Sequence, residues 1–568
     1  MPHPTTKPLP RSLDVFSEFL LSRPVPSALR DALSAARCRP EAECVAALMA
    51  DATPDGEQAL QVSDLARRLS LQMRERDPGA LESLMQAFPL GSAEGQSLLR
   101  LAEALLRIPD TATQDALIRD QVGKGDWARN IGRDKSLLVN AAAKGMSLAG
   151  RLTASKGFSL RSLTSLTSAP MIRRAMDRTI RMMGSQFVPG ENIHAALKAS
   201  REQAARGFTF SYDMLGESAL TATDASAFLE RCEQALEALG QHAGVSGTIH
   251  ERPSLSLKLS GLHPRFSRTK RARIMDELLP VLQRLAIRAR HLDIGLMIDA
   301  EESERLDIAL DVFEALCTLP ELEGWNGLGF ALQAYNRCAP ELLNILIDIG
   351  ARTHRRIMVR LVKGAYWNRE IRRAQVEGLD FPVFTRKCHT DLSYLACARR
   401  MLSAPAEIYP QFATHNAQTI AHIHTIAGPF QAGRYEFQCL HGMAETLSRE
   451  VLSPSGLDVP CRVYVPVGTY ETLLGYLLRR FVENGAGSSF INQVASQAVS
   501  VEALIVDPVR AARAIPASEC ANPSIRAPSD LFEPGHRNSA GFDIRTSKPC
   551  GHLKRPLIVL APSIDWNQ

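Results

Sequence analysis

The sequence predicts an α/β protein built around a (β/α)8 barrel of the TIM type, preceded by an all-helical arm and domain. From residue 208 onward, eight short apolar or β-branched runs alternate with helical patterns. Strands that alternate with helices pair in parallel through right-handed crossovers. Eight such units within about 300 residues favour a closed barrel. A doubly wound open sheet is the competing architecture.

The residues before the barrel are predicted to be helical. Residues 1–60 are rich in proline and then mixed helical, which indicates an N-terminal arm. Residues 61–182 contain no strand pattern, and runs such as "SLLRLAEALLRIPD" place apolar residues at helical spacing. We therefore predict a helical domain over 61–182 and the barrel over 183–512.

The eight predicted strands are short runs, each followed by a helical pattern such as "IMDELLPVLQRLAIRARH". In chain order they are "FTFSYDML", "SLSLKLS", "IGLMIDA", "GLGFALQAY", "IMVRLVKGAYW", "IYPQFATHN", "YEFQCLHG" and "CRVYVPVG". After about residue 515 the alternation ends in a stretch rich in proline, serine and asparagine. Residues 513–568 are therefore expected to form a linker and a truncated tail.

Composition excludes several classes of protein. The net charge of +5 over 568 residues is too dilute to indicate a nucleic-acid partner. No apolar run is long enough to span a membrane, and the first residues lack the apolar core of a secretion signal. The 11 cysteines include no C-x-x-C pair, which is typical of reduced cytosolic thiols and not of a zinc site. We therefore expect a cytoplasmic protein with no metal.

Polar and charged residues gather towards one end of each predicted strand. In a barrel, the C-terminal ends of the strands carry the chemistry. Cations outnumber anions in this group, so we expect an anionic substrate such as a carboxylate and a cofactor that bears phosphate. No dinucleotide-binding glycine fingerprint is present, so the barrel itself has to hold any flavin. The strand-end residues are Asp213, Lys258, Asp299, Gln333, Tyr335, Arg360, Lys363, Tyr366, Trp367, Thr414, His415, Asn416, Gln438, His441 and Tyr464.

A predicted helix after the eighth strand carries two adjacent arginines, in "GYLLRRFVENG". Neighbouring helix residues point about 100° apart, so Arg479 and Arg480 do not share one solvent face. One interpretation is ion pairing with Glu483, one turn further on. The other is a clamp on a substrate carboxylate, because guanidinium groups match carboxylates in a planar fork.

Many long segments, in order, closely resemble the proline dehydrogenase region of the bifunctional proline utilization A family. The resemblance spans roughly residues 40–545. Its segments include "GSAEGQSLLRLAEALLRIPDTATQDALIRD", "RTIRMMGSQFV", "SYDMLGESA", "SLSLKLSGLHPRF", "MIDAEESERLD", "RLVKGAYWNREI", "TRKCHTDLSYLACARRML", "FATHNAQTI", "CRVYVPVGTYETLLGYLLRRFVENGA" and "SSFIN".

The resemblance implies a barrel with non-covalent FAD that oxidises L-proline to Δ1-pyrroline-5-carboxylate and reduces a membrane quinone. It also implies that the protein is cytoplasmic and in peripheral contact with the inner face of the membrane. By resemblance, the proline pocket consists of Lys258, Asp299, Tyr366, Leu440, Tyr464, Arg479 and Arg480. By resemblance, the FAD-binding residues are Gln333, Arg360, Lys363, Gly364, Trp367, Thr385, Lys387, Thr414, His415, Gln438 and Glu483.

The sequence departs from the family pattern at both ends. No strand–helix–helix pattern of a DNA-binding segment opens the chain, and no segment resembles the family's aldehyde dehydrogenase half. We therefore expect no nucleic-acid partner and a reaction that stops at pyrroline-5-carboxylate. The alternatives are an inactive remnant of a bifunctional protein and a DNA-binding regulator. The sequence leaves the oligomeric state open.

Overall fold

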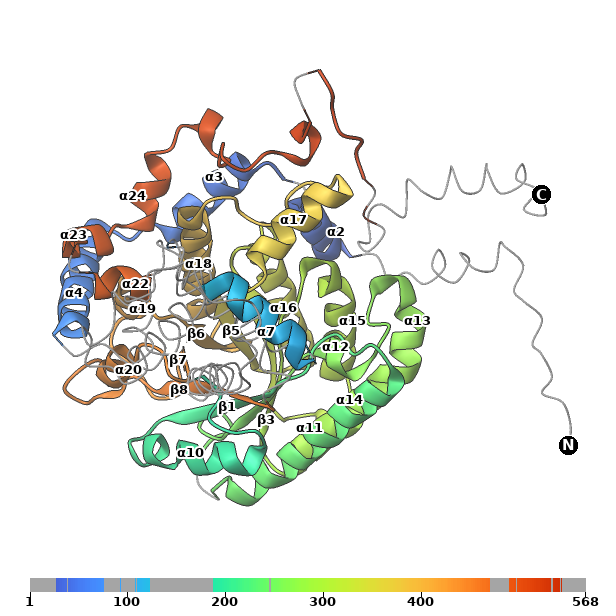
Figure 1. The fold of residues 1–568 in the computed structure, drawn as a ribbon. Helices are drawn as coiled ribbons and strands as arrows, with labels where there is room; N and C mark the ends of the chain where they lie inside the picture. Colours follow the sequence, from blue (N-terminus) through green and yellow to red (C-terminus); the bar gives the residue numbers. More distant parts are fainter. Residues whose placement is uncertain are drawn as a thin grey trace, which may run out of the picture.

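The structure is a computed structural model in which a closed barrel lies at the centre (Figure 1). It describes residues 27–37, 39–75, 92, 108, 110–122, 187–244, 247–469, 490–496, 498–532, 535–541 and 543. None of the helices in these residues combines the length and apolar character that a membrane span requires.

Eight parallel strands close into the barrel in chain order, as predicted. The first strand pairs with the last, with Thr209 opposite Arg462, and this pairing removes both sheet edges. Almost every strand residue is buried, as expected where helices cover the outside of a parallel sheet. The strands are β1 (Thr209–Met214), β2 (Ser254–Leu257), β3 (Gly295–Ile298), β4 (Leu328–Gln333), β5 (Ile357–Val362), β6 (Ile408–Ala413), β7 (Glu436–Leu440) and β8 (Cys461–Val467).

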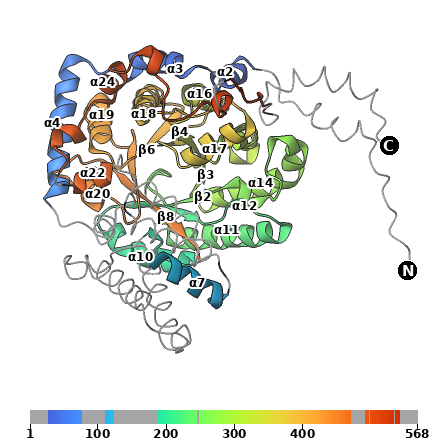
Figure 2. The same cartoon turned by 45° about the horizontal axis from the view of Figure 1, so that its top comes forward.

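Helices follow strands β1 to β7 and cover the barrel (Figures 1 and 2). They are α11 (Ala222–His242), α12 (Leu259–Leu262), α13 (Arg271–Arg273), α14 (Leu279–His291), α15 (Leu306–Cys317), α16 (Ala339–Thr353), α17 (Trp367–Glu377), α18 (Lys387–Leu402), α19 (Ala417–Ala427) and α20 (Glu445–Leu452). Before the barrel come α2 (Ala28–Arg37), α3 (Glu41–Ala52), α4 (Gly56–Arg74), α7 (Thr111–Val122) and α10 (Ile193–Ala205). After it come α22 (Phe490–Ala495), α23 (Val501–Leu504) and α24 (Pro508–Arg513).

The N-terminal helices α2, α3 and α4 lie on the outer surface of the barrel. They pack against α16, α18 and α19 respectively (Figure 2). A capping box between Asp55 and Gln58 fixes the start of α4, because each side chain bonds the other residue's backbone N–H. Helix α4 runs across the predicted boundary between residues 60 and 61, so the arm and the start of the helical region form one helix.

The segment after α24 packs closely against the barrel. Its backbone is mostly irregular, as expected, with short 3-10 turns at Ala517–Glu519 and Pro528–Asp530. The guanidinium of Arg386 donates to the carbonyls of Glu519 and Cys520, at 2.9 and 3.0 Å. The described part of the predicted linker is therefore attached to the barrel wall.

A buried ion pair fills the N-terminal end of the barrel. The guanidinium of Arg462 lies 2.6 Å from the carboxylate of Glu436, and both side chains are 1% exposed. Arg462 also donates to the carbonyls of His250 and Arg252. The His250 ring stacks on Tyr409 at a centroid distance of 3.8 Å. This end of the barrel therefore depends on charge pairing as well as on apolar packing.

We predict that acid weakens the fold partly through His250. Burial, with the nearby charges of Arg356 and Arg462, lowers the pKa of His250 to about 3. Because the unfolded chain takes up this proton near pH 6.5, the stability that neutral His250 contributes is complete above that pH and is lost on acidification towards pH 3. From pH 7 to 5 this loss should reach about 2 kcal/mol in the free energy of unfolding.

Urea unfolding at several pH values measures this loss. His250→Phe retains a ring for stacking and should show a smaller fall in stability between pH 7 and 5. The surface variant His242→Gln, at the end of α11, serves as the control. Its free energy of unfolding should fall between pH 7 and 5 by as much as that of the parent protein. An equal fall in the free energy of unfolding between pH 7 and 5 for all three proteins would contradict the prediction.

Candidate active site

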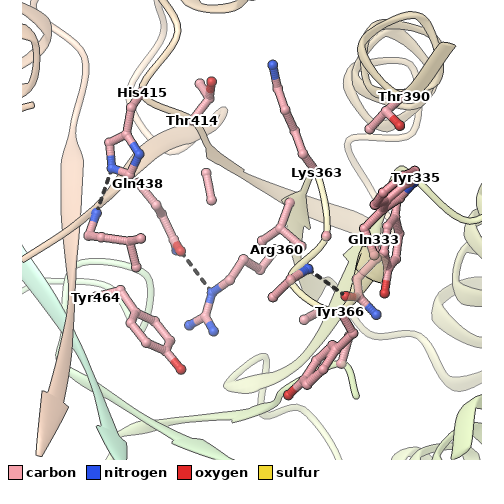
Figure 3. A pocket seen from close by; sticks show the side chains of 18 of the residues that line it. Gln333, Tyr335, Arg360, Lys363, Tyr366, Thr390, Thr414, His415, Gln438 and Tyr464 are labelled. Atoms are coloured by element: carbon pink, nitrogen blue, oxygen red, sulfur yellow. Dashed lines mark hydrogen bonds between the residues drawn. The ribbon is translucent and has the colours of Figure 1, made fainter. Parts of the chain in front are cut away.

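A cavity of about 610 Å³ opens at the C-terminal ends of the strands. Its size lies within the usual range for small-molecule and cofactor sites. Side chains from β4 to β8 converge on it, as the labelled residues in Figure 3 show. The cavity therefore lies where the sequence predicted the chemistry.

Lys258, directly after β2, is held between two buried carboxylates. Its ammonium group lies 2.8 Å from Asp213 and 3.2 Å from Asp299. Tyr464 donates its hydroxyl to the same oxygen of Asp299, at 2.7 Å. An ammonium group has three donors, so one N–H of Lys258 has no partner among the described residues.

Arg360, on β5, crosses the barrel interior and joins several strands. It donates to Asp299 at 2.6 Å and to Gln438 at 2.9 Å. Its remaining bonds are to the hydroxyls of Ser211 and Ser256. The guanidinium carbon also lies 4.8 Å from the ring centre of Tyr464. Arg360 is thus held rigidly below the cavity, with its bond to Gln438 visible in Figure 3.

The two carboxylates of this cluster differ in their electrostatics. Burial opposes ionisation of Asp299, but the charges of Lys258 and Arg360 prevail and lower its pKa. Burial raises the pKa of Asp213, and the like charge of Asp299 adds to this, although Lys258 and a hydrogen bond with Tyr464 act in the opposite direction. Burial and both carboxylates also raise the pKa of Tyr464, which keeps its hydroxyl protonated. Asp299 is therefore the better-stabilised anion at this end of the cavity.

A second group of charges lines another part of the cavity. The carboxylate of Asp391 lies 2.5 Å from the ammonium of Lys363 and 3.1 Å from that of Lys387. Among the described residues, these two cations share one carboxylate, and both lysines line the cavity. Burial opposes ionisation of Asp391, but the two lysines lower its pKa. Such a site suits an anion such as a diphosphate.

Gly364, between β5 and α17, allows the ring of Tyr335 to pack directly against the backbone. Its φ of +131° lies where residues with side chains are strained. A Cβ at this position would lie 2.5 Å from the ring of Tyr335. Next to it, Trp367 donates its indole N–H to the carbonyl of Phe384 at 2.8 Å. The backbone and two aromatic rings therefore shape this wall.

Three polar residues of the cavity have their side chains fixed by backbone groups. Gln333 donates to the carbonyl of Glu301 and accepts from the N–H of Ala365. His415 accepts from the backbone N–H of Leu440 at its Nε2, so Nδ1 carries the proton in the neutral ring (Figure 3). Thr414 accepts from the N–H of Asn416, which itself caps α19.

The structure brings most of the predicted site residues into one cavity. The residues that line it are Lys258, Asp299, Gln333, Arg360, Lys363, Gly364, Tyr366, Trp367, Thr385, Lys387, Thr414, His415, Gln438, Leu440 and Tyr464. Arg479, Arg480 and Glu483 lie outside the described residues, so their roles stay predictions. Among the described residues, no cluster of histidine, cysteine and carboxylates has the arrangement of a metal site.

Sequence reasoning gave no role to two carboxylates that the site uses. Asp213 was noted at a strand end, but its bond to Lys258 appears only once β1 and β2 pair. Asp391 lies one helical turn after Lys387, a spacing that favours an ion pair. That spacing could have identified one of its contacts, whereas its bond to Lys363 depends on the tertiary fold.

Three family models match successive parts of the chain. The model described as Proline dehydrogenase matches residues 196–493. The model described as Proline utilization A proline dehydrogenase N-terminal domain matches residues 27–74. A third, described as DNA-binding domain of Proline dehydrogenase, matches residues 80–187. The first match spans every strand of the barrel.

Curated relatives and solved structures resemble the chain over most of its length. The bifunctional protein PutA of Escherichia coli K12 is 47% identical over 98% of this chain, which spans 43% of that protein. Proline dehydrogenase 1 of Bacillus subtilis strain 168 is 28% identical over 55% of this chain and 90% of its own length. A crystal structure of Bradyrhizobium japonicum proline utilization A is 39% identical, with a TM-score of 0.72, over 92% of this chain and 53% of that one.

We predict that Asp299 is essential for stability. Asp299→Ala leaves the buried cations of Lys258 and Arg360 with one carboxylate fewer. Removing one partner of a buried pair typically costs about 3–5 kcal/mol in the free energy of unfolding. The double variant Asp299→Ala/Arg360→Met should lose less free energy of unfolding than the two single variants together, because the second substitution removes the charge that the first leaves unpaired.

Urea unfolding of the single and double variants measures both effects. Asp348→Ala, on the surface of α16, is the control, because it breaks an exposed ion pair with Arg352 at 2.7 Å. Exposed pairs contribute about 0–1 kcal/mol. A loss at Asp299 as small as that at Asp348 would show that the buried cluster does not stabilise the fold.

Proposed function

The chain belongs to the proline dehydrogenase family, and on this basis we propose that it oxidises L-proline to Δ1-pyrroline-5-carboxylate with FAD as cofactor. One observation carries the proposal. The cavity at the strand ends combines a buried cluster around Lys258 and Asp299 with a separate cationic group at Lys363 and Lys387. The first suits a small zwitterion, and the second suits the phosphates of a cofactor.

The residues present fit FAD. Lys363 and Lys387 offer positive charge for its diphosphate, and Gly364 lets the Tyr335 ring pack directly on the backbone of the cavity wall. Trp367 and His415 present ring surfaces, while Arg360, Gln333, Gln438 and Thr414 supply polar groups around the cavity. When bound, FAD accepts a hydride from the substrate carbon next to nitrogen. Glu483 is a further proposed contact by family resemblance.

The remaining residues of the cluster would hold the substrate. The N–H of Lys258 that has no partner among the described residues can donate to the proline carboxylate, together with Arg479 and Arg480 as the family resemblance implies. Asp299, kept ionised by Lys258 and Arg360, favours a positive charge at the substrate nitrogen. Tyr464, Tyr366 and Leu440 close the pocket around the ring. A fixed ring orientation is the main contribution of such a site to the rate.

We infer the electron acceptor and location of the protein from the family resemblance alone. A membrane quinone is the proposed acceptor, and the proposed contact with the inner face of the membrane is peripheral. The name of the model that matches residues 80–187 refers to DNA binding. Because the net charge is only +5 over 568 residues, we still expect no nucleic-acid partner.

We expect the purified protein to carry FAD that L-proline reduces without added nicotinamide. Anaerobic addition of proline should bleach the flavin absorbance near its long-wavelength maximum. Pyrrolidine, which lacks the carboxylate, should react poorly, because the cations of the pocket then have no anion to bind. A colourless and well-folded protein that binds no added FAD would refute the proposal.

The arginine pair should control substrate affinity. We predict that Arg479→Met or Arg480→Met weakens proline binding by about 2–5 kcal/mol, the usual loss when one partner of a buried charge pair is truncated. FAD content should stay near that of the parent. Steady-state kinetics with proline and with pyrrolidine separate the two interpretations. If both variants keep the parent KM and kcat for proline, the pair is an ion-pair site for Glu483.

A further inference from the structure

One carboxylate of the N-terminal arm reaches the wall of the cavity. Glu41 is the first residue of α3, and its side chain is 2% exposed. One of its oxygens accepts from the backbone N–H of Thr385 at 2.9 Å, and the other accepts from the Thr385 hydroxyl at 2.7 Å. Thr385 itself lines the cavity between β5 and α18. The arm therefore contacts a proposed cofactor-binding residue directly.

Glu41 is fully engaged with the barrel. Besides Thr385, it contacts Nδ1 of the buried His389 at 2.7 Å and the guanidinium of Arg337 at 3.3 Å. Burial opposes ionisation of Glu41, but these hydrogen bonds and the charge of Arg337 lower its pKa. A buried carboxylate is stable only when its oxygens are satisfied in this way. All of these partners belong to the barrel.

A second segment reaches the same threonine from the other end of the chain. The backbone N–H of Asn522 donates to the hydroxyl of Thr385 at 2.8 Å, and Asn522 also lines the cavity. The Thr385 hydroxyl thus donates its one hydrogen to Glu41 and accepts one bond from Asn522. A hydroxyl has two acceptor positions, so one has no donor among the residues that the structure describes.

This arrangement limits what Thr385 can bind. A phosphate oxygen carries no hydrogen, and the only hydrogen of the Thr385 hydroxyl already points to Glu41. Thr385 can therefore accept a hydrogen bond from a ligand hydroxyl or amino group, but cannot donate one to a phosphate. The cations Lys363 and Lys387 remain the groups suited to phosphate.

We propose that Glu41 is a positioning residue for the cofactor, which acts by orienting Thr385 to accept from a hydroxyl or amino group of FAD. The inference rests on the proposed function, since it requires FAD in this cavity. It assigns the N-terminal arm a role in cofactor retention. Both side-chain oxygens that accept from Thr385 belong to one carboxylate of the arm, so a single substitution tests this role.

The test measures how fast FAD leaves the full-length holoenzyme after dilution, from the rise in free-flavin fluorescence. Glu41→Gln keeps the size of the side chain but replaces one acceptor oxygen with a donor. Release should become about tenfold faster, the change expected when hydrogen bonds to one charged group are lost. Glu43→Gln is the matched control, since Glu43 is exposed in the first turn of the same helix. It should release FAD at the parent rate.

A second variant tests the route through Thr385. Thr385→Val removes the hydroxyl and should also speed release, and the double variant with Glu41→Gln should be no faster than the faster single variant. Thr385→Ser, which keeps the hydroxyl, should restore a rate near that of the parent. If Glu41→Gln does not fold, the comparison of Thr385→Val with Thr385→Ser alone decides whether the Thr385 hydroxyl helps to retain FAD.

The outcomes separate the inference from the proposed function. A parent protein without releasable FAD would refute the function. If the parent holds FAD and Glu41→Gln releases it at the parent rate, only the inference is wrong. Equal acceleration by Glu41→Gln and Glu43→Gln would assign the effect to helix charge and overturn it. An additive double variant would equally overturn it, because Glu41 would then act independently of Thr385.

Discussion

The buried ion pair between Arg360 and Asp299, at 2.6 Å, is the interaction on which the rest of the site depends. Neither charge is stable in the barrel interior alone, because removal from water is costly unless the group is paired. Arg360 also bonds Ser211, Ser256 and Gln438, so one guanidinium joins β1, β2, β3 and β7 from its place on β5. The closed barrel and the polar cluster therefore require each other.

The same network connects the two ends of the barrel. Gln438 accepts from Arg360 and donates to Glu436 at 2.9 Å. Glu436 in turn pairs with Arg462 at the N-terminal end. Residues 436 and 438 lie two apart on one strand and so face the same side. A continuous line of hydrogen bonds thus joins the cavity to the opposite end, and groups that appear structural also help to orient the groups of the cavity.

Segments outside the barrel complete the site. Glu41 from the arm and Asn522 from the C-terminal segment both bond Thr385. The barrel alone would leave the Thr385 hydroxyl without these partners. The match of a separate family model to residues 27–74 covers the helix that carries Glu41. The cavity is therefore the product of three stretches of chain that lie far apart in sequence.

The sequence by itself determined the eight strands, their parallel order and the end of the barrel that carries the chemistry. Strand and helix periodicity are local properties, and a parallel barrel places all strand ends on one face. Lys258, Asp299 and Arg360 could be predicted for that reason. Only the tertiary structure decided the partners of each group. Glu41 and Thr385 are 344 residues apart, and no local pattern specifies a contact across such a distance. The burial that makes these pairings strong, as between Asp213 and Lys258, arises only when the barrel closes.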